Sequence, residues 1–405
     1  MARALRGWTL ISVLALVGCR TMNARGAITF EPTPQALLAD PSSDPSIVVR
    51  ASSQVFALVL RGRDGGGGDL VMVRSDDAGD HFGDPLAIGA APGEVRAHVG
   101  GTPRLLLGPR SELYAVWATP QALEVARSTD YGKSFGAPVP VPMRGARAPS
   151  FFDAAVAPDG TLLLAWLGRV PNKPTPKGTA GVSVASSRDG VHFDVAPGVA
   201  SGACPCCRPA LAADSQGRWF LSFRTVRAGI RDMVAMVTAD RGGTWSAPVP
   251  VSRDGWRIDG CPHSGPALAV VNGALYVAWY SEAGGAPRLY WTRSPTARLA
   301  FAPRRRLSGA LLDANQPALA VQGGQVFAAF QARDPHARGG WAPTGIYLRR
   351  LADGAAPPSR VPSGAGGAHG ARLASMGAGR WAVVWTQQGQ GATAELARAR
   401  TRPTP

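Results

Sequence analysis

Four of the five cysteines in the chain lie in two short segments, and these segments have the most distinctive chemistry in the sequence. The first reads Cys204-Pro205-Cys206-Cys207 and the second reads Cys261-Pro262-His263. Thiolate sulfurs together with one imidazole form a donor set that suits copper(I) or zinc. The spacing fits no zinc-finger pattern, so the two segments would have to meet in the fold to make a metal site.

Disulfide bonding is the alternative for these four cysteines, because it is usual in exported proteins with an even number of thiols. One bridge from Cys261 to the first segment would leave two cysteines there to pair as adjacent or near-adjacent residues. A disulfide prefers a Cα separation of ~4.4–6.8 Å and a dihedral angle near ±90°, which such a pair strains. A metal site holding copper or zinc, structural disulfides and a redox-active thiol therefore stay open as interpretations.

Further candidates for ligand binding lie close to the cysteines in sequence. Arg208 adjoins the first segment, Arg231 and Asp232 open a nearby strand, and Trp256 precedes the second segment. The alternative for Arg231 and Asp232 is an ion pair at a strand end, which contributes little at a surface. The alternative for Trp256 is a packing role. No phosphate-binding loop, dinucleotide fingerprint, H-E-x-x-H motif or nucleophile elbow stands out, so no catalytic residue is assigned.

A repeated turn organises the chain around these segments. Four copies of Ser/Thr-x-Asp-x-Gly-x-x-aromatic occur, and the third is one residue short. The hydroxyl and the carboxylate can hydrogen-bond the backbone of their own turn, and glycine supplies a positive φ. The pattern residues are Ser75, Asp77, Gly79, Phe82, Ser128, Asp130, Gly132, Phe135, Ser187, Asp189, Phe193, Thr238, Asp240, Gly242 and Trp245.

Short apolar strands accompany each turn, and the same order of strands recurs in parts of the chain that lack the turn. Together they define seven units, which begin near residues 45, 100, 150, 204, 261, 314 and 368. Strong turn signals and the lack of any long 3.6-residue period predict an all-β fold. In the fourth and fifth units, Cys204 and Cys261 both stand five residues before the proline of the first strand. Cys206 and His263 both stand three residues before it. Adjacent units therefore present thiol or imidazole groups at matching positions.

The repeated turn resembles the Asp box of sialidases and related propellers. The resemblance implies an all-β, sialidase-like β-propeller, for which we expect seven blades, with six as the alternative because sialidases have six. It also implies that the loops entering the innermost strands, and hence the cysteines, ring the mouth of a central channel where ligands bind. The cysteine-rich run itself resembles a subset of bacterial sialidase-like lipoproteins.

The resemblance does not extend to the residues of sialidase catalysis. Members of that family use an arginine triad, a Tyr/Glu pair and an Asp acid, and the first arginine lies in an Arg-Ile-Pro motif. This chain has Asp44-Pro45-Ser46-Ile47-Val48 at that place. We therefore expect a propeller that binds a ligand, in its most concrete form a soft metal ion, and is not an enzyme. The alternatives are an exo-α-sialidase-type glycoside hydrolase and a protein-interaction scaffold with structural disulfides.

The N-terminal residues predict export and lipid anchoring. Residues 1–18 combine basic residues with an apolar run far shorter than the ~20 residues that span a bilayer, which is typical of a signal peptide. The run ends in Leu16-Val17-Gly18-Cys19, which resembles a bacterial lipobox with Cys19 as the lipidated residue. We expect a tether over residues 19–44, with a ring-closing strand at 27–31, then a propeller over 45–401. The expected location is the cell envelope, at the outer membrane.

The net charge of +16 does not predict nucleic-acid binding. The basic residues are almost all arginines, and they are scattered along the chain apart from Arg304-Arg305-Arg306. Nucleic-acid-binding surfaces instead gather their basic residues on one face. The expected partners are the membrane, through the anchor, and a small ligand, glycan or metal at the channel. The sequence does not predict an oligomeric state.

Overall fold

The computed structural model describes residues 28–62, 68–89, 93–95, 97, 101–143, 149, 151–169, 175–337, 342–352, 354, 356–389 and 391–401. Every regular element within these ranges is a β-strand. The expected signal peptide and the lipidation residue Cys19 lie outside the described residues. No helix in the described part of the chain is long and apolar enough to cross a membrane.

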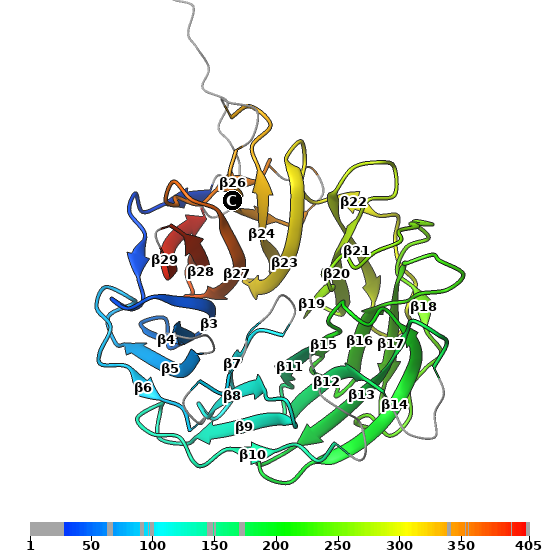
Figure 1. Ribbon diagram of the computed structural model, residues 1–405, viewed down its shortest axis with the longest axis horizontal. Helices are drawn as coiled ribbons and strands as arrows, with labels where there is room; N and C mark the ends of the chain where they lie inside the picture. Colours follow the sequence, from blue (N-terminus) through cyan, green and yellow to red (C-terminus); the bar gives the residue numbers. More distant parts are fainter. Residues whose placement is uncertain are drawn as a thin grey trace, which may run out of the picture.

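The strands form seven antiparallel sheets that stand around a central axis as the blades of a propeller (Figure 1). Blades one to three consist of β3 (Ser42–Arg50), β4 (Gln54–Gly62), β5 (Gly68–Ser75) and β6 (Leu86–Ala87); β7 (Arg104–Leu107), β8 (Leu113–Ala118), β9 (Leu123–Ser128) and β10 (Val139–Pro140); and β11 (Phe152–Val156), β12 (Leu162–Gly168), β13 (Ala180–Ser187) and β14 (Asp194–Ala203).

Blades four to six repeat this order. They consist of β15 (Ala210–Ala213), β16 (Trp219–Arg224), β17 (Met233–Thr238) and β18 (Val249–Pro250); β19 (Ala267–Val271), β20 (Ala274–Ser281), β21 (Arg288–Pro295) and β22 (Arg305–Arg306); and β23 (Leu312–Gln322), β24 (Gln325–Arg333), β25 (Gly345–Arg350) and β26 (Ser359–Arg360). In every blade the first strand lies innermost, so seven first strands surround the channel (Figure 1).

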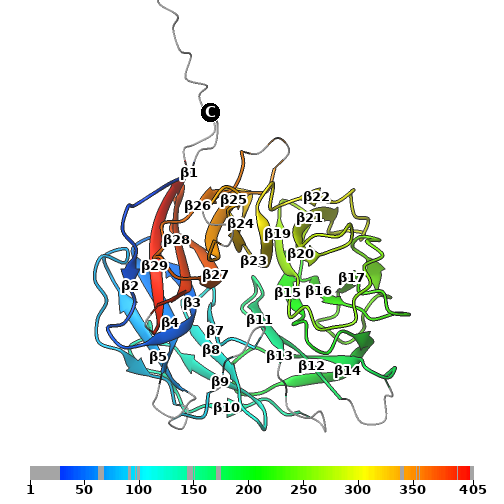
Figure 2. The ribbon, with the colours of Figure 1, turned by 45° about the horizontal axis from the view of Figure 1, so that its top comes forward.

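The N-terminal segment completes the seventh blade. This blade contains β27 (Ala368–Ser375), β28 (Arg380–Gln388) and β29 (Ala392–Thr401), and β1 (Ile28–Phe30) pairs with the outer edge of β29. The short β2 (Gln35–Ala36) pairs with the same strand, and Figure 2 shows both beside it. Part of the segment expected as a tether is therefore built into the ring, which closes with seven blades and covers an edge that would otherwise be open.

Apolar side chains on the middle strands fill the space between blades. The second strands of four blades carry Trp117, Trp166, Trp279 and Trp385, and each indole is at most 1% exposed. Trp117 in blade two packs with residues of β4 and β5 in blade one, so the faces of neighbouring sheets form one apolar layer. The core is thus a ring of inter-blade layers, which fixes each blade relative to the next.

The repeated turns connect the third and fourth strands of blades one to four. In the first, the Ser75 hydroxyl donates to the Asp77 carboxylate (2.7 Å) and accepts the N–H of Gly79 (2.9 Å). In the second, Gly132 has a φ of 75°, and a Cβ there would lie 2.9 Å from Met72 of the first blade. Glycine therefore serves both the left-handed backbone and the close approach of two blades.

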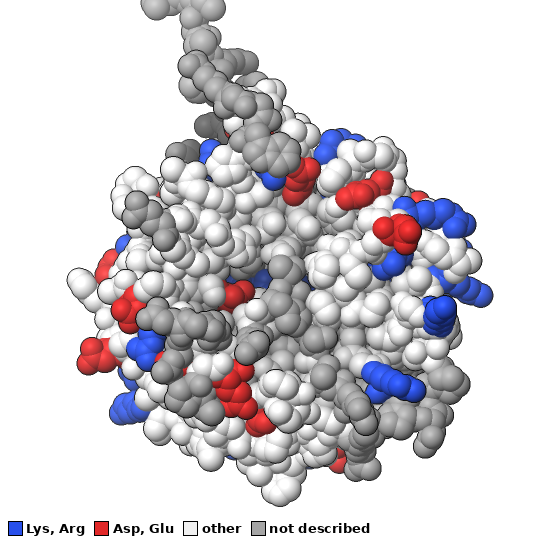
Figure 3. All heavy atoms as spheres, viewed as in Figure 1, with Lys and Arg blue, Asp and Glu red and all other residues white. Residues whose placement is uncertain are grey.

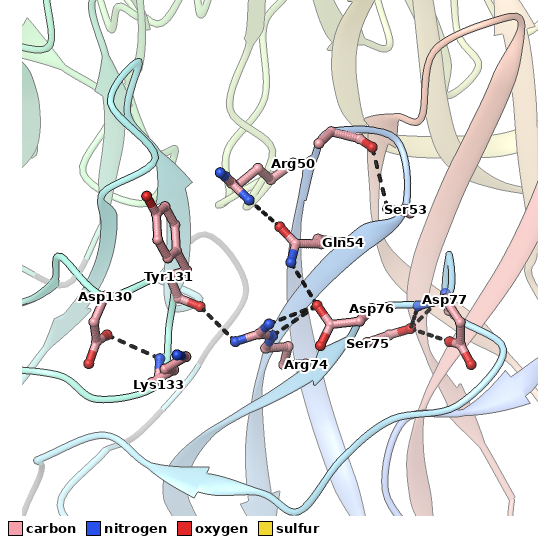
Figure 4. Close-up of polar contacts among 12 residues, drawn as sticks. Arg50, Ser53, Gln54, Arg74, Ser75, Asp76, Asp77, Asp130, Tyr131 and Lys133 are labelled. Carbon is pink, nitrogen blue, oxygen red and sulfur yellow. Dashed lines mark hydrogen bonds and ion pairs between the residues drawn. The ribbon is translucent and has the colours of Figure 1, made fainter.

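A polar network joins the first two of these turns, as Figure 4 shows. Arg74 donates to the Asp76 carboxylate (2.8 Å) and to the Tyr131 carbonyl (3.3 Å) of the next blade. Gln54 donates to the same carboxylate (2.7 Å), and the Arg50 guanidinium stacks 4.4 Å from the centre of the Tyr131 ring. These contacts are structural, because they tie neighbouring blades together around their own turns.

The repeated turns and the cysteines lie on opposite faces of the ring. Ser75 ends β5 beside Val55, where the chain passes from the first strand to the second. The cysteines instead precede the first strand, and the N–H of Cys204 donates to the carbonyl of Arg224 at the end of β16 (2.8 Å). In Figure 3 the acidic side chains of the described residues lie mainly at the left and lower left of the face shown, and most of the basic ones lie at the right with uncharged side chains between them.

Candidate metal centre at the channel mouth

The segment Cys204–Cys207 is a tight turn that leads into β15. The N–H of Cys207 donates to the carbonyl of Cys204 (3.4 Å), which folds the turn over Pro205. The Sγ atom of Cys204 lies 3.6 Å from that of Cys206 and 3.3 Å from that of Cys207. All three side chains are buried and all three are free thiols. A four-residue turn therefore brings three sulfur atoms close together.

The second segment carries Cys261 and His263, which are both exposed. His263 has a φ of 48°, a conformation that is uncommon outside glycine. Its Nδ1 lies 2.8 Å from the carbonyl oxygen of Cys261, so Nδ1 carries the hydrogen in the neutral ring. This tautomer leaves the lone pair of Nε2 available to a ligand.

Gly265 allows the two segments to meet. A Cβ at this position would lie 2.3 Å from the carbonyl oxygen of Arg208 and 2.6 Å from its Cγ. Backbone therefore packs against backbone between blades four and five, and only glycine fits. The close approach places Cys261 and His263 beside the buried sulfurs, as the matching positions in the repeats predict.

The donor atoms form two groups of three that share Cys206. In one group the sulfurs of Cys204, Cys206 and Cys207 all lie within 4.8 Å of one another. In the other, the sulfurs of Cys206 and Cys261 and a ring nitrogen of His263 meet the same limit. All five predicted residues are thus brought together. Soft sulfur with one imidazole is a set that binds copper(I) or zinc, so the residues fit the metals that the sequence suggests.

Hydrogen bonds within the cluster favour a negative charge on Cys204. The thiols of Cys206 and Cys207 hydrogen-bond to its sulfur and lower its pKa, and Arg231 Nη1 donates to the same sulfur at 3.1 Å. The bonds to Cys204 correspondingly raise the pKa of Cys206 and that of Cys207. A lowered pKa at Cys204, whose sulfur accepts a hydrogen bond from Arg231, favours the deprotonated sulfur that a metal ion requires.

A second arginine connects the two blades that carry the cluster. Arg224 is 1% exposed and donates to the carbonyls of Arg231 (2.8 Å), Ser264 (3.2 Å) and Tyr280 (2.7 Å). Its guanidinium therefore joins blade four to blade five directly beneath the two cysteine segments. Sequence reasoning missed this residue, because an arginine at the end of an apolar strand looks like an ordinary surface residue.

Two of the remaining candidates shape the loops around the cluster. Asp232 accepts the N–H groups of Gly255 (3.1 Å) and Trp256 (3.3 Å), so it orders the loop before the second segment. Trp256 is 4% exposed and packs edge-on against Tyr280. Arg231 contacts Cys204 rather than pairing with its neighbour Asp232. Asp232 and Trp256 thus order the loop that precedes the second cysteine segment.

The Arg208 side chain lines the channel. It belongs to a set of charged side chains that includes Arg104, Asp153 and Arg372. Arg104 pairs with Asp153 at 3.2 Å, Arg208 lies 4.0 Å from the same carboxylate, and Arg372 donates to Thr102 (3.2 Å). Burial lowers the pKa of Arg208, and burial together with Arg104 and Arg208 lowers that of Arg372. The channel holds more positive than negative charge, which a bound anion would offset.

These channel residues occupy one equivalent position of the repeat. Arg104, Asp153 and Arg372 each pair with the residue that precedes the aromatic of the second strand in blades two, three and seven. The equivalent positions of the other four blades hold small residues, namely Ser46, Ala210, Ala267 and Ala318. All seven line a central cavity of about 660 Å³. Aligning the repeats on the strand aromatic would have found them.

A smaller pocket joins the channel to the candidate metal centre. Its volume is about 210 Å³, and its lining includes Asp44, Arg208, His263, His369 and Arg372. Burial lowers the pKa of His369, so this imidazole is neutral around pH 7. His263 belongs to the pocket and to the second donor group alike. A metal ion on that group would therefore face a cationic pocket.

A Tyr/Glu pair exists in the structure but lies outside the pocket. The Tyr280 hydroxyl donates to the Glu282 carboxylate, and burial followed by this contact raises the pKa of Tyr280. Tyr280 packs in the layer between blades five and six, and neither residue lines the channel or its mouth. The pair therefore does not present a nucleophile to a ligand held by the channel arginines.

The geometry defines a seven-bladed β-propeller whose channel mouth carries a Cys/His cluster, and its fold is sialidase-like. A protein of unknown function from Dyadobacter fermentans DSM 18053 matches with a TM-score of 0.54 and 15% identity, covering 93% of this chain and 99% of the other. The polysaccharide lyase Uly1 matches with a TM-score of 0.52, 11% identity and 90% coverage of both chains.

The microbial sialidase Hz136 (Hadza) matches with a TM-score of 0.51 and 14% identity, covering 88% of this chain but 65% of that enzyme. No family model matches the chain, and no curated protein resembles it in sequence. Identities this low show the fold alone. Since one neighbour is a sialidase and another a lyase, the architecture does not choose the chemistry.

Proposed function

We propose that this propeller binds a soft metal ion, copper or zinc, through the Cys/His cluster at its channel mouth. The observation that carries the proposal is the convergence of Cys204, Cys206, Cys207, Cys261 and His263 from two blades into overlapping donor groups. Three buried thiols from one repeat lie beside an exposed thiol and an imidazole from the next repeat, and a metal ion would bond to donors of both segments.

The charges around the cluster support the same proposal. Metal binding requires deprotonated sulfurs, and several thiolates close together repel one another. Arg231 contacts one sulfur directly, and Arg224 lies beneath the cluster with its positive charge close to Cys207. Two cations beside the sulfurs lower the electrostatic cost of a thiolate cluster.

Metal analysis of the full chain tests the proposal. Protein purified anaerobically with reductant is loaded with Cu(I) or Zn²⁺, freed of excess ion and assayed for bound metal. The parent is expected to retain the ion, and Cys206→Ser and His263→Ala are expected to lose it or bind it more weakly. His192→Ala is the matched histidine control, since His192 is exposed in a repeated turn. Cys19→Ser in every protein removes the fifth thiol. A parent that retains neither metal overturns the proposal.

Thiol mapping separates the metal site from the structural alternative. Mass mapping without reduction, on protein isolated from the envelope, distinguishes free thiols from bridges. Free or metal-protected thiols are expected. If all four prove bridged, the interpretation as a scaffold with structural disulfides replaces the metal site.

Glycoside hydrolysis of the sialidase type is a second candidate, favoured by the channel arginines. Arg104, Arg208 and Arg372 converge from three blades on a pocket large enough for a small anion, as a carboxylate clamp requires. Hydrolysis of a fluorogenic sialoside, compared between the parent and Arg372→Met, tests it. Turnover lost in the variant supports this candidate, and no turnover in the parent removes it.

We further propose that the protein is exported and anchored to the outer membrane through a lipid on Cys19. The support is the sequence of residues 1–19. Labelling cells with radioactive palmitate should mark the parent and leave Cys19→Ala unmarked. A parent that incorporates no label overturns this part of the proposal.

A further inference from the structure

The arrangement of the donors carries information beyond their identity, and it bears on how many ions bind. A single zinc ion with Zn–S bonds of about 2.3 Å holds four tetrahedral donors about 3.8 Å apart from one another. Here the separations of 3.6 Å and 3.3 Å from Cys204 meet this limit within the first segment. Across the two segments the five donors fall into two groups of three, with Cys206 common to both.

The two groups also differ in their surroundings. Cys204, Cys206 and Cys207 are 0%, 6% and 1% exposed and are floored by Phe151 and Val226. Cys261 and His263 are exposed, and His263 lines the mouth pocket. One group is thus closed to solvent, and the other opens toward the place where a small ligand would enter.

We infer that the cluster holds two copper(I) ions bridged by the thiolate of Cys206. This inference rests on the proposed metal function and specifies its ion and stoichiometry. Copper(I) is a soft d¹⁰ ion that accepts three donors in a plane, whereas structural zinc sites take four protein ligands. A bridging thiolate lets three donors serve each ion without any residue from a third segment.

Charge balance is compatible with two monovalent ions. Four thiolates carry four negative charges, two copper(I) ions offset two of them, and Arg231 and Arg224 offset the others. One divalent ion would give the same sum, so the grouping in threes, and not the charge, selects two ions. The buried ion would be retained, while the exposed ion, whose ligand His263 borders the cationic pocket, would exchange.

Titration of the anaerobic full chain with Cu(I) against a chromogenic chelator, combined with native mass spectrometry, tests the inference. All proteins carry Cys19→Ser, and His192→Ala is the control. The parent is expected to bind two ions. Cys207→Ser removes a ligand of the buried ion alone, and Cys261→Ser removes a ligand of the exposed ion alone, so each variant is expected to bind one. Cys206→Ser is expected to weaken both ions by at least tenfold. Circular dichroism confirms that each variant folds.

The outcomes separate this inference from the proposed function. Two ions in the parent and one in each of the two single-site variants support the bridged pair. One ion in the parent, lost equally in Cys207→Ser and Cys261→Ser, overturns the bridged pair but leaves the metal function intact. No ion in the parent overturns both. Metal–metal scattering in the X-ray absorption spectrum of the doubly loaded parent is an independent readout that misfolded variants cannot affect.

Discussion

Replacing Gly265 by alanine should weaken metal binding without removing any metal ligand. The added Cβ would lie 2.3 Å from the carbonyl oxygen of Arg208, whereas ordinary contact begins at 3.4 Å. The obstructing atom belongs to the backbone that leads directly into β15, so it cannot move aside as the end of a flexible side chain could. The second cysteine segment must therefore shift away from the first by roughly 1 Å, which is the usual response to overpacking at a rigid contact.

The size of the effect follows from that shift. Overpacking of this kind costs about 1–3 kcal/mol of folding free energy, which a seven-bladed ring can lose and remain folded. Metal sites tolerate ligand displacements of only about ±0.2 Å, so a shift of roughly 1 Å separates Cys261 and His263 from Cys206. We expect Gly265→Ala to lower the affinity of the group that contains His263 by at least tenfold and to leave the buried group of sulfurs nearly unchanged.

The assay is the Cu(I) competition titration, with thermal unfolding measured on the same samples. Gly391→Ala is the matched control, because a Cβ at that position meets nothing within 4 Å. A Gly265→Ala protein that is destabilised but binds metal with the parent affinity and stoichiometry would refute the reasoning. It would show that the close approach of the two segments does not hold the donors together.

Three further outcomes follow from the structure. Ser128→Ala leaves the buried N–H of Gly132 without its acceptor, so urea unfolding should show a loss of about 1–3 kcal/mol in the free energy of unfolding. The control Ser201→Ala, at an exposed serine, should show almost no loss. Hydrogen bonds from the hydroxyl and amide of Ser134 lower the pKa of Asp130 from 3.8 to about 2. The stability this carboxylate contributes is therefore complete above pH 4 and lost as the pH falls toward 2, and Asp130→Asn should show a shallower loss in chemical unfolding over that range. Arg372→Met should abolish the rise in melting temperature that sialic acid, used as a carboxylate probe, causes in the parent; an equal rise in both proteins would place the probe elsewhere.

The fold could be predicted from the sequence because its signals repeat. Four copies of the same turn, each followed by a short apolar strand, gave the strands and their order, and the count of seven blades is confirmed. The weakest part of that prediction was the seventh blade, where only three strands were visible in the C-terminal unit. The fourth lies at the other end of the chain, as β1, and only the need to cover an open edge pointed to it.

The sequence predicted only those site residues whose type is rare in this chain. Cysteine is scarce in this chain, so matching positions in two adjacent repeats drew attention to the donors. Arginine is abundant and scattered, so Arg104 and Arg372 stand out only when the repeats are aligned on the aromatic of the second strand. Their importance depends on a register within each blade, which is fixed by pairing with the second strand and not by any local motif.

The residues that we propose as ligand-binding groups occupy positions at which the repeats differ from one another. The turns on one face are alike because each does the same work of joining a blade to its neighbour. On the opposite face, the channel position holds alanine or serine in four blades and a charged residue in three, and the loop before the first strand carries sulfur in blades four and five. Substituting serine at Cys206 should therefore weaken metal binding by at least tenfold. It should leave the melting temperature of the metal-free protein within a few degrees of the parent, because the inter-blade layers do not depend on this residue. A metal-free Cys206→Ser protein that unfolds far below the metal-free parent would instead show that the thiol belongs to the structural core and would argue against a separation of fold and function.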